Sequence, residues 1–135
     1  MDPTTTLYER MGGDKTIRTI VEAFYPRVQQ DPLLAPLFPA DIQPVMERQY
    51  QFLTQFFGGP PLYSHIHGHP RLRARHLPFP ITPERAEAWL RCMSAALDDA
   101  NIEGELRDEI WSRFYFTAAH MVNQPGEEEE KADRD

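Results

Sequence analysis

The chain contains little of what stabilises secreted or membrane-spanning proteins. Cys92 is its one cysteine among 135 residues, so an intramolecular disulfide is excluded and a reducing compartment is favoured. No apolar run approaches the roughly 20 residues of a membrane-spanning helix. The N-terminus also lacks the basic and then apolar opening of a secretory signal. We therefore expect a cytoplasmic protein with no membrane partner.

Positive charge is also scarce. The 14 lysines and arginines are outnumbered by 21 aspartates and glutamates, which gives a net charge of −7. This argues against a nucleic-acid partner, because phosphate binding requires a basic surface. Residues 127–135 hold six acidic and two basic side chains and so carry −4 of that charge. Such segments are usually solvated, so we predict one domain over residues 1–124 and a disordered acidic tail over residues 125–135.

Strand patterns are missing, and the apolar residues recur instead at helical spacing. One amphipathic helix is predicted from about Asp14 to Gln30, and a second from about Gln43 to Phe57, where a glycine pair ends it. A third is expected to begin at Thr82-Pro83, an N-cap residue followed by a first-turn proline. A fourth is expected from near Glu105, and a short leading helix around Leu7. The sequence thus predicts an all-α fold.

The spacing also predicts which faces of two of these helices point inward. The inward face of the second helix is predicted to hold Val45, Gln49, Phe52, Leu53 and Phe56. The inward face of the third is predicted to hold Ala86, Trp89, Leu90, Met93 and Leu97.

The segment Gly58–Ile81, between the second and third helices, holds five prolines and three of the seven glycines and is predicted to be irregular. An irregular segment of this length inside a compact domain usually has a function. Its backbone polar groups need partners, and its apolar side chains need something to cover. A large flat apolar ligand would give the segment a reason to be ordered.

The run Leu72–Phe79 places one histidine, His76, between arginines and apolar residues. We interpret His76 as the candidate axial ligand of a haem iron, because one neutral imidazole leaves the opposite face of the iron open for a gas. Its other ring nitrogen then needs an acceptor that orients it, and we expect a loop carbonyl in that role. The alternative is a surface or hydrogen-bonded core histidine, which would be preferred without the residues described next.

Three side chains that can donate hydrogen bonds stand on three different predicted helices: Tyr25, Gln49 and Trp89. We expect them on the opposite side of the cofactor, where they would donate to a bound oxygen molecule that draws negative charge from the iron. Ordinary core packing explains Tyr25 and Trp89 equally well, whereas a buried amide at Gln49 needs partners. Pro26 follows Tyr25 directly and predicts a bend or a new turn that would re-aim the tyrosine.

Further residues are candidates for contacts with the cofactor's face and edge. Phe38 is placed to pack flat against a porphyrin, although a plain core phenylalanine fits its context as well. Arg48, Tyr63 and Arg75 are candidates to reach the haem propionates. Solvated surface charge is the alternative for the arginines, and for a further candidate, Arg73, it is the preferred one.

The alternating histidines His65, His67 and His69 suggest a competing site. Zinc or a metal pair held there would allow ester hydrolysis through a metal-bound hydroxide. Alternating ligands share one side of a strand, however, and nothing nearby predicts a sheet or supplies an acidic ligand. We therefore expect His69 to brace the loop, and we assign no role to His120 of the last helix.

With these residues in place, the chain resembles the group II truncated haemoglobins, the two-over-two helical globins common in bacteria. The resemblance covers almost everything from Leu7 to about Asn123. Its most specific parts are QYQFLTQFFGGPPLY at 49–63, HGHP at 67–70, LRARH at 72–76, AEAWL at 86–90 and AHMVN at 119–123.

The resemblance implies haem b as the cofactor and His76 as the proximal metal ligand. It also implies a distal hydrogen-bonding set of Tyr25, Gln49 and Trp89. By the same resemblance, Phe38 packs on the porphyrin, and Arg48 and Tyr63 contact the propionates. A gating position of such globins falls on Val45, where many relatives carry alanine, threonine or serine. Valine cannot donate a hydrogen bond, so ligand stabilisation is expected to rest on the distal set. Pro26 is a second departure from the relatives.

The sequence therefore predicts a two-over-two globin sandwich around a haem, with a long ordered loop before the proximal histidine. The expected function is reversible binding of oxygen, carbon monoxide and nitric oxide at a pentacoordinate iron, for oxygen transport or scavenging. The alternative is a haem enzyme that reduces peroxide or oxidises nitric oxide and needs a separate reductase as electron donor. A haem-free helical interaction module is a third alternative. A monomer and a weak homodimer are both open.

Overall fold

A computed structural model describes residues 5–124, with the exception of the Arg73 side chain. The predicted acidic tail therefore lies outside the described residues. Every element within this range is a helix, in the order α1 Leu7–Met11, α2 Asp14–Gln30, the 3-10 helix η1 Ala35–Leu37, α3 Gln43–Phe56, α4 Leu62–His67, α5 Leu72–His76, α6 Pro83–Asp99 and α7 Gly104–Met121. The all-α prediction is confirmed for the described part of the chain.

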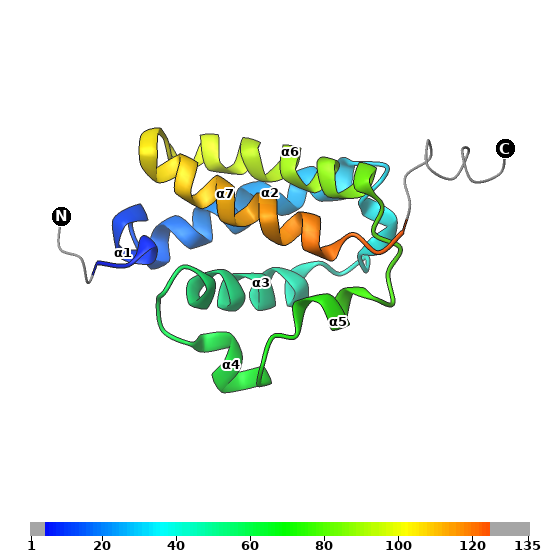
Figure 1. Cartoon of the computed structure of the whole chain (residues 1–135), viewed down its shortest axis with the longest axis horizontal. Helices are drawn as coiled ribbons and strands as arrows, with labels where there is room; N and C mark the ends of the chain where they lie inside the picture. Colours follow the sequence, from blue (N-terminus) through cyan, green and yellow to red (C-terminus); the bar gives the residue numbers. More distant parts are fainter. Residues whose placement is uncertain (1–4, 125–135) are drawn as a thin grey trace, which may run out of the picture.

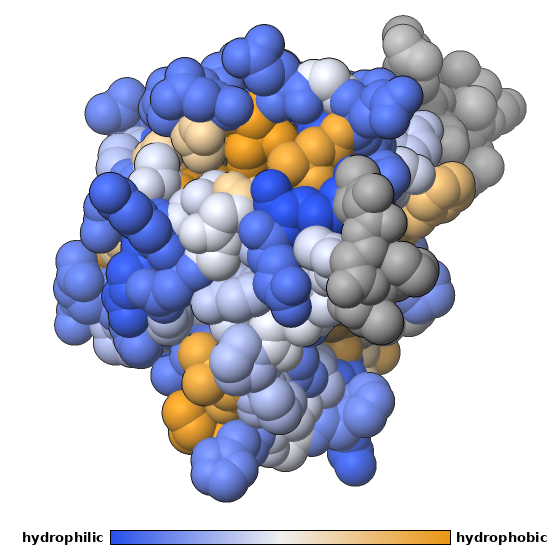
Figure 2. Space-filling view, turned by 90° about the vertical axis from the view of Figure 1, so that its left-hand side faces the viewer, coloured by the Kyte–Doolittle hydropathy of each residue, from blue (hydrophilic) through white to orange (hydrophobic). Residues whose placement is uncertain are grey.

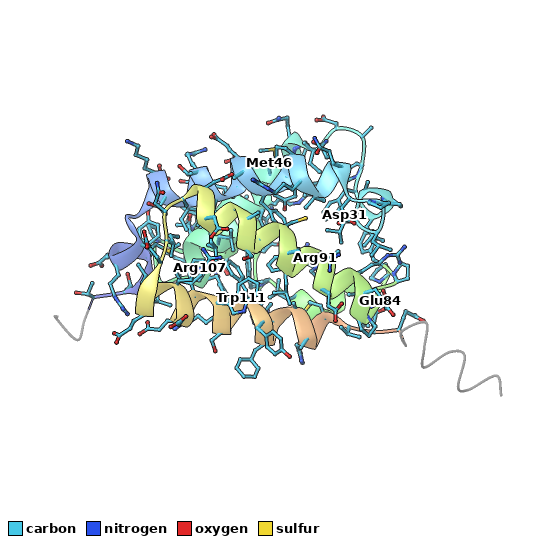
Figure 3. The ribbon with its side chains drawn as sticks, turned by 90° about the horizontal axis from the view of Figure 1, so that it is seen from above. Asp31, Met46, Glu84, Arg91, Arg107 and Trp111 are labelled. Carbon is cyan, nitrogen blue, oxygen red and sulfur yellow. The ribbon has the colours of Figure 1, made fainter. Side chains whose placement is uncertain are left out.

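The four long helices form the body of the molecule. α2 packs against both α3 and α6, and α6 packs against α7. Figure 1 shows α2, α6 and α7 together above α3, with the short α4 and α5 along the lower edge. Seen from above, α6 lies between α2 and α7 (Figure 3). None of the described helices is long and apolar enough to cross a membrane.

The helix boundaries follow the predicted capping signals closely. The Thr82 hydroxyl accepts a hydrogen bond from the backbone N–H of Arg85 at 3.2 Å, and Pro83 takes the first helical position. This confirms the predicted start of α6. After α3, Gly59 leaves no room for a side chain, because a Cβ atom there would lie 2.9 Å from the Thr54 carbonyl oxygen.

The buried face of α3 differs from the prediction. Tyr50, Leu53 and Thr54 are buried, whereas four of the five predicted residues, Val45, Gln49, Phe52 and Phe56, are only half-buried. Helical spacing identified Leu53 but missed Tyr50, whose hydroxyl donates to the Asp14 carboxylate and so ties α3 to α2. The physical reason is that α3 packs against both α2 and α4. The residues that face the core and the residues that are half-buried therefore lie on different faces of the helix.

The buried face of α6 also differs from the predicted one. The predicted Met93 and Leu97 are buried, but the remainder of the buried face is Ala88, Cys92 and Ala96, and Trp89 is half-buried. Small residues on this face allow close packing against α2 and α7. Burial raises the pKa of the Cys92 thiol, and the nearby Asp31 acts in the same direction. Cys92 is therefore a packed neutral thiol.

The segment Gly58–Ile81 is more regular than predicted, because α4 and α5 lie within it. These helices have six and five residues. Helices so short are not stable alone in water, so apolar spacing gives no signal for them and tertiary contacts hold them in place. The predicted long loop is in fact two helical turns joined by irregular residues.

Pro26 does not end α2, which continues to Gln30. The proline lacks the N–H that would donate to Glu22. One residue later, the Arg27 guanidinium donates to the Ala23 carbonyl at 2.8 Å and pairs with the Asp99 carboxylate at 2.9 Å. These contacts stabilise the helix next to the proline and join the end of α2 to α6.

The end of the molecule that carries α1 is mostly hydrophilic. Figure 2 shows this face with a few separate apolar patches among charged and polar residues. On the α6–α7 side, the Arg107 guanidinium donates to the Ser94 hydroxyl at 2.9 Å and to Asp98 at 2.7 Å, and it points from α7 toward α6 in Figure 3. These polar contacts fix the α6–α7 pair from outside the core.

Candidate functional site

His76 is the last residue of α5 and is half-buried. Its Nδ1 atom lies 2.6 Å from the carbonyl oxygen of Leu72, one helical turn earlier. Because a carbonyl only accepts, Nδ1 carries the proton and donates. In a neutral imidazole, Nε2 then keeps its lone pair and can bind a metal. The acceptor that orients the imidazole is thus a carbonyl of α5 itself. The prediction of a loop carbonyl was wrong because Leu72 lies in a short helix and not in a loop.

Tyr25 and Trp89 lie in one continuous aromatic cluster. The Tyr25 ring meets Phe38 with centroids 6.1 Å apart and Phe24 at 4.9 Å. Phe24 in turn meets Trp89 at 5.3 Å, and Trp89 meets Phe114 at 5.4 Å. The structure therefore brings together three predicted site residues from α2, from the segment after η1 and from α6.

The Tyr25 hydroxyl is held in its neutral form. Tyr25 is 3% exposed, and burial raises the pKa of its hydroxyl far above the ordinary value, while the positive charge of Arg48 acts weakly in the opposite direction. The hydroxyl is therefore protonated at neutral pH and available as a donor.

The two predicted α3 residues of the site occupy neighbouring turns. Val45 and Gln49 are four residues apart and both half-buried. Since residues at this spacing share a helix face, they form one stripe beside the buried face of α3. Arg48, next to Gln49, is exposed but close enough for its charge to act on Tyr25.

Tyr63 and Arg75 also lie together. The Arg75 guanidinium carbon is 5.6 Å from the centroid of the buried Tyr63 ring. Phe52 of α3 and His67 of α4 pack against the same ring at 6.0 Å and 4.7 Å. A cation over an aromatic face is attracted by the ring, so Tyr63 holds the end of α5 close to α3 and α4.

The alternating histidines do not converge. The His67 Nε2 atom lies 2.9 Å from the Gln51 side-chain oxygen, and His69 accepts a hydrogen bond from the Arg71 backbone N–H at 3.1 Å. His69 thus braces the loop before α5. Within residues 5–124, no group of three histidine, cysteine, aspartate or glutamate side chains is arranged to hold a metal ion.

An open cavity of about 860 Å³ lies between α3, the segment from α4 to α5, and α7. Its lining residues are Phe52, Gln55, Phe56, Ser64, His69, Pro70, Arg71, Leu72, Phe116, Thr117, His120 and Met121. Leu72, whose carbonyl orients His76, connects this cavity to α5. Of the predicted distal set, Tyr25 and Trp89 belong to the aromatic cluster, and none of the three residues lines this cavity.

One wall of the cavity is built by a pair that sequence reasoning missed. The Gln55 side-chain amide donates to the Ser64 hydroxyl at 2.7 Å and accepts from the Ser64 backbone N–H at 2.8 Å. This double contact fixes α4 against α3. The sequence offers no local signal for it, because Gln55 is one of several glutamines in its helix.

The residues present fit a haem. His76 offers one imidazole with a free Nε2 atom, which is the donor that haem iron binds in globins. The buried Tyr25 side chain offers a protonated hydroxyl. Aromatic and apolar side chains surround Tyr25, and cationic side chains stand near Tyr25 and Tyr63.

Comparison with known proteins gives a consistent result. The family model for bacterial-like globins matches residues 6–123. The chain is 55% identical over 112 residues to group 2 truncated hemoglobin YjbI of Bacillus subtilis, covering 83% of this chain and 85% of that one. It is 39% identical over 122 residues to group 2 truncated hemoglobin 3-1 of Lotus japonicus, covering 87% and 72%.

Solved structures agree over the whole described fold. The group II truncated haemoglobin of Bacillus anthracis superposes with a TM-score of 0.91 at 50% identity, covering 93% of this chain and 97% of that one. The truncated oxygen-avid haemoglobin of Bacillus subtilis superposes with a TM-score of 0.85 at 53% identity, covering 88% and 100%. The predicted two-over-two globin sandwich is therefore confirmed, and this chain belongs to the bacterial-like globin family as a group II truncated haemoglobin.

Proposed function

We propose that this chain binds haem b through the Nε2 atom of His76 and reversibly binds molecular oxygen on the opposite side of the iron. The observation that carries the proposal is the 2.6 Å hydrogen bond from His76 Nδ1 to the Leu72 carbonyl. It fixes the tautomer in which Nε2 is free to bind iron. Globins bind gaseous ligands such as oxygen, and one similar solved structure is of an oxygen-avid haemoglobin.

The other candidate residues would hold the porphyrin. Phe38, which contacts Tyr25 edge to face, offers an aromatic surface for its flat ring. Val45 adds apolar contact from the half-buried stripe of α3. Arg48, Tyr63 and Arg75 would meet the propionates, because guanidinium and phenol groups donate strongly to carboxylates.

The haem iron, when bound, supplies the position at which a diatomic gas binds. The chain supplies the hydrogen-bond donors around that position. Tyr25 donates through a hydroxyl that burial keeps protonated, and the Trp89 indole N–H can only donate. Gln49 offers an amide from the half-buried stripe of α3. Val45 cannot donate, so these three residues would carry the stabilisation of the gas.

The test is the absorption spectrum of the reduced protein with and without carbon monoxide. The wild-type chain is expected to purify with a Soret band that shifts on adding the gas, and its pyridine extract should have the bands of haem b. His76→Ala is expected to lose haem or the shift, because no other residue replaces the imidazole. Free imidazole added to this variant should restore the shift by filling the space left by the side chain.

His65→Ala is the matched control, since it removes an exposed histidine of α4. It should leave the spectrum unchanged. If His76→Ala instead keeps its haem and its gas-induced shift while His65→Ala loses them, the assignment of the proximal ligand is refuted.

A further inference from the structure

The helix that carries His76 cannot hold its own position. α5 has five residues, and His76 is the last of them. The final carbonyls of a helix have no partner within it, and one turn of helix is unstable in isolation. The orientation of the candidate iron ligand therefore depends on contacts made by other parts of the chain.

Asn123 supplies those contacts from the end of α7. Its side-chain Nδ2 donates to the His76 carbonyl at 3.2 Å and to the Phe79 carbonyl at 2.9 Å. Its Oδ1 atom accepts from the Ile81 backbone N–H at 3.0 Å, and its own backbone N–H donates to the Ile81 carbonyl at 2.9 Å. One residue thus engages both the end of α5 and the turn that follows.

The chemistry of these contacts requires an amide. Two carbonyls need donors and one N–H needs an acceptor, and only an amide side chain offers both at once. An aspartate of the same shape could still accept from Ile81 but would face the two carbonyls with its own oxygens. The orientation of the amide is unambiguous, because carbonyls only accept and the backbone N–H only donates.

A second side chain holds the next residue of this turn. The Arg85 guanidinium donates to the Pro80 carbonyl at 2.6 Å and to the Leu33 carbonyl at 3.0 Å. The Phe79 backbone N–H closes the turn by donating to the His76 carbonyl at 2.9 Å. Arg85 of α6 and Asn123, which follows α7, therefore hold successive carbonyls of the turn after α5. The apolar side chains of this turn, Leu77 and Phe79, are exposed.

We propose that Asn123 is a positioning residue for the proximal ligand: by holding the His76 carbonyl and the turn 77–81, it sets where the imidazole stands against the haem iron. This inference rests on the proposed function of His76. Loss of the Asn123 donor would let the last turn of α5 fray, which weakens the Nδ1 contact to Leu72 and with it the hold on the haem.

Two variants test the proposal in the full-length chain. Asn123→Asp removes the donors and keeps the acceptor, and Asn123→Ala removes both. Haem transfer to an excess of a scavenging apoprotein should be about tenfold faster from either variant, which corresponds to the loss of one hydrogen bond of ordinary strength. In the reduced protein, the iron–histidine stretching band should broaden, because the imidazole then samples several orientations.

Amide hydrogen exchange of the haem-free chain supplies a readout that does not depend on haem. The Phe79 amide should exchange faster in both variants. The Ile81 amide should exchange faster in Asn123→Ala only, since aspartate still accepts from it. Asn101→Asp is the control: it makes the same chemical change at an exposed residue after α6, and it should leave exchange at residues 77–81, the stretching band and haem loss as in the wild type.

The outcomes separate the two hypotheses. Wild-type rates of haem loss and of Phe79 exchange in both Asn123 variants would overturn the positioning role while leaving haem binding by His76 intact. If the wild-type chain takes up no haem at all, the proposed function fails, and the exchange pattern alone then decides whether Asn123 holds the turn.

Discussion

At the scale of single residues, the chemistry of the site depends on which proton each side chain carries. The carbonyl of Leu72 decides this for His76, because it forces the proton onto Nδ1. A phenol is already protonated at neutral pH, and burial raises the pKa of the Tyr25 hydroxyl further. Iron ligation by His76 would require a neutral imidazole, and donation by Tyr25 would require a neutral phenol.

Removing a donor near the gas should speed its release. Tyr25→Phe keeps the ring that packs against Phe24 and deletes only the hydroxyl. Trp89→Phe removes the indole N–H by replacing the indole with a smaller phenyl ring, which keeps an aromatic side chain next to Phe24. A hydrogen bond to a group carrying charge contributes about 1.5–3 kcal/mol, so we expect oxygen to dissociate roughly tenfold to a hundredfold faster from each variant. Stopped-flow displacement of oxygen by carbon monoxide measures the rate.

Tyr115→Phe is the control for that measurement, because it removes the same hydroxyl from an exposed position on α7. Its oxygen dissociation rate should equal that of the wild type. Rates that stay unchanged in both the Tyr25 and Trp89 variants would show that neither side chain touches the bound gas.

At the scale of helices, α2 is the element in which local preference and tertiary structure disagree. A proline in a helix interior costs about 3 kcal/mol relative to alanine, yet α2 continues past Pro26. The side-chain contacts of Arg27 with Ala23 and Asp99 offset part of that cost. The helix is therefore maintained by its packing against α3 and α6 and not by its own propensity.

Replacing this proline should stabilise the protein. Pro26→Ala restores the missing backbone donor at an exposed position, so we expect the free energy of unfolding of the haem-free chain to rise by about 1–3 kcal/mol. Urea denaturation followed by circular dichroism measures it. Pro32→Ala, in the turn after α2, is the control and should give no such gain. A loss of stability in Pro26→Ala would mean that the core around Tyr25 requires the geometry that the proline imposes.

At the scale of the whole molecule, charge is distributed unequally along the chain. The family match ends at residue 123. Residues 125–135 contain −4 of the net charge of −7, which leaves −3 for residues 1–124. The prediction that residues 1–124 form the complete globin domain follows from this distribution.

Deleting residues 125–135 tests that prediction. The shortened chain should keep its free energy of unfolding within about 0.5 kcal/mol of the full chain, because surface changes away from the core have effects of this size. Its haem content should also be unchanged. Denaturation and the absorption spectrum of both chains provide the measurement, and a loss of several kcal/mol would place the tail within the folded domain.

Features of the fold and of the candidate site could be predicted from the sequence where they depend on residues close together in the chain. Helical spacing and capping residues are local, so both bounds of the first two long helices and the starts of the other two were predicted within one residue. His76 and the three distal residues were identified as candidates from residue type. The buried face of α3 was mispredicted at Tyr50, and α4 and α5 were not predicted, because both depend on neighbours distant in the sequence.

The amino-acid sequence by itself determined the helices, through the periodicity of apolar residues, and the chemical groups available to a haem, through the types of side chain in its motifs. Only the tertiary structure decided how those groups are held. The Leu72 carbonyl selects the tautomer of His76 because α5 is helical, and Asn123 reaches the His76 carbonyl across 47 residues. Hydrogen bonds over such separations form only when packing brings their ends together, and no local pattern records them.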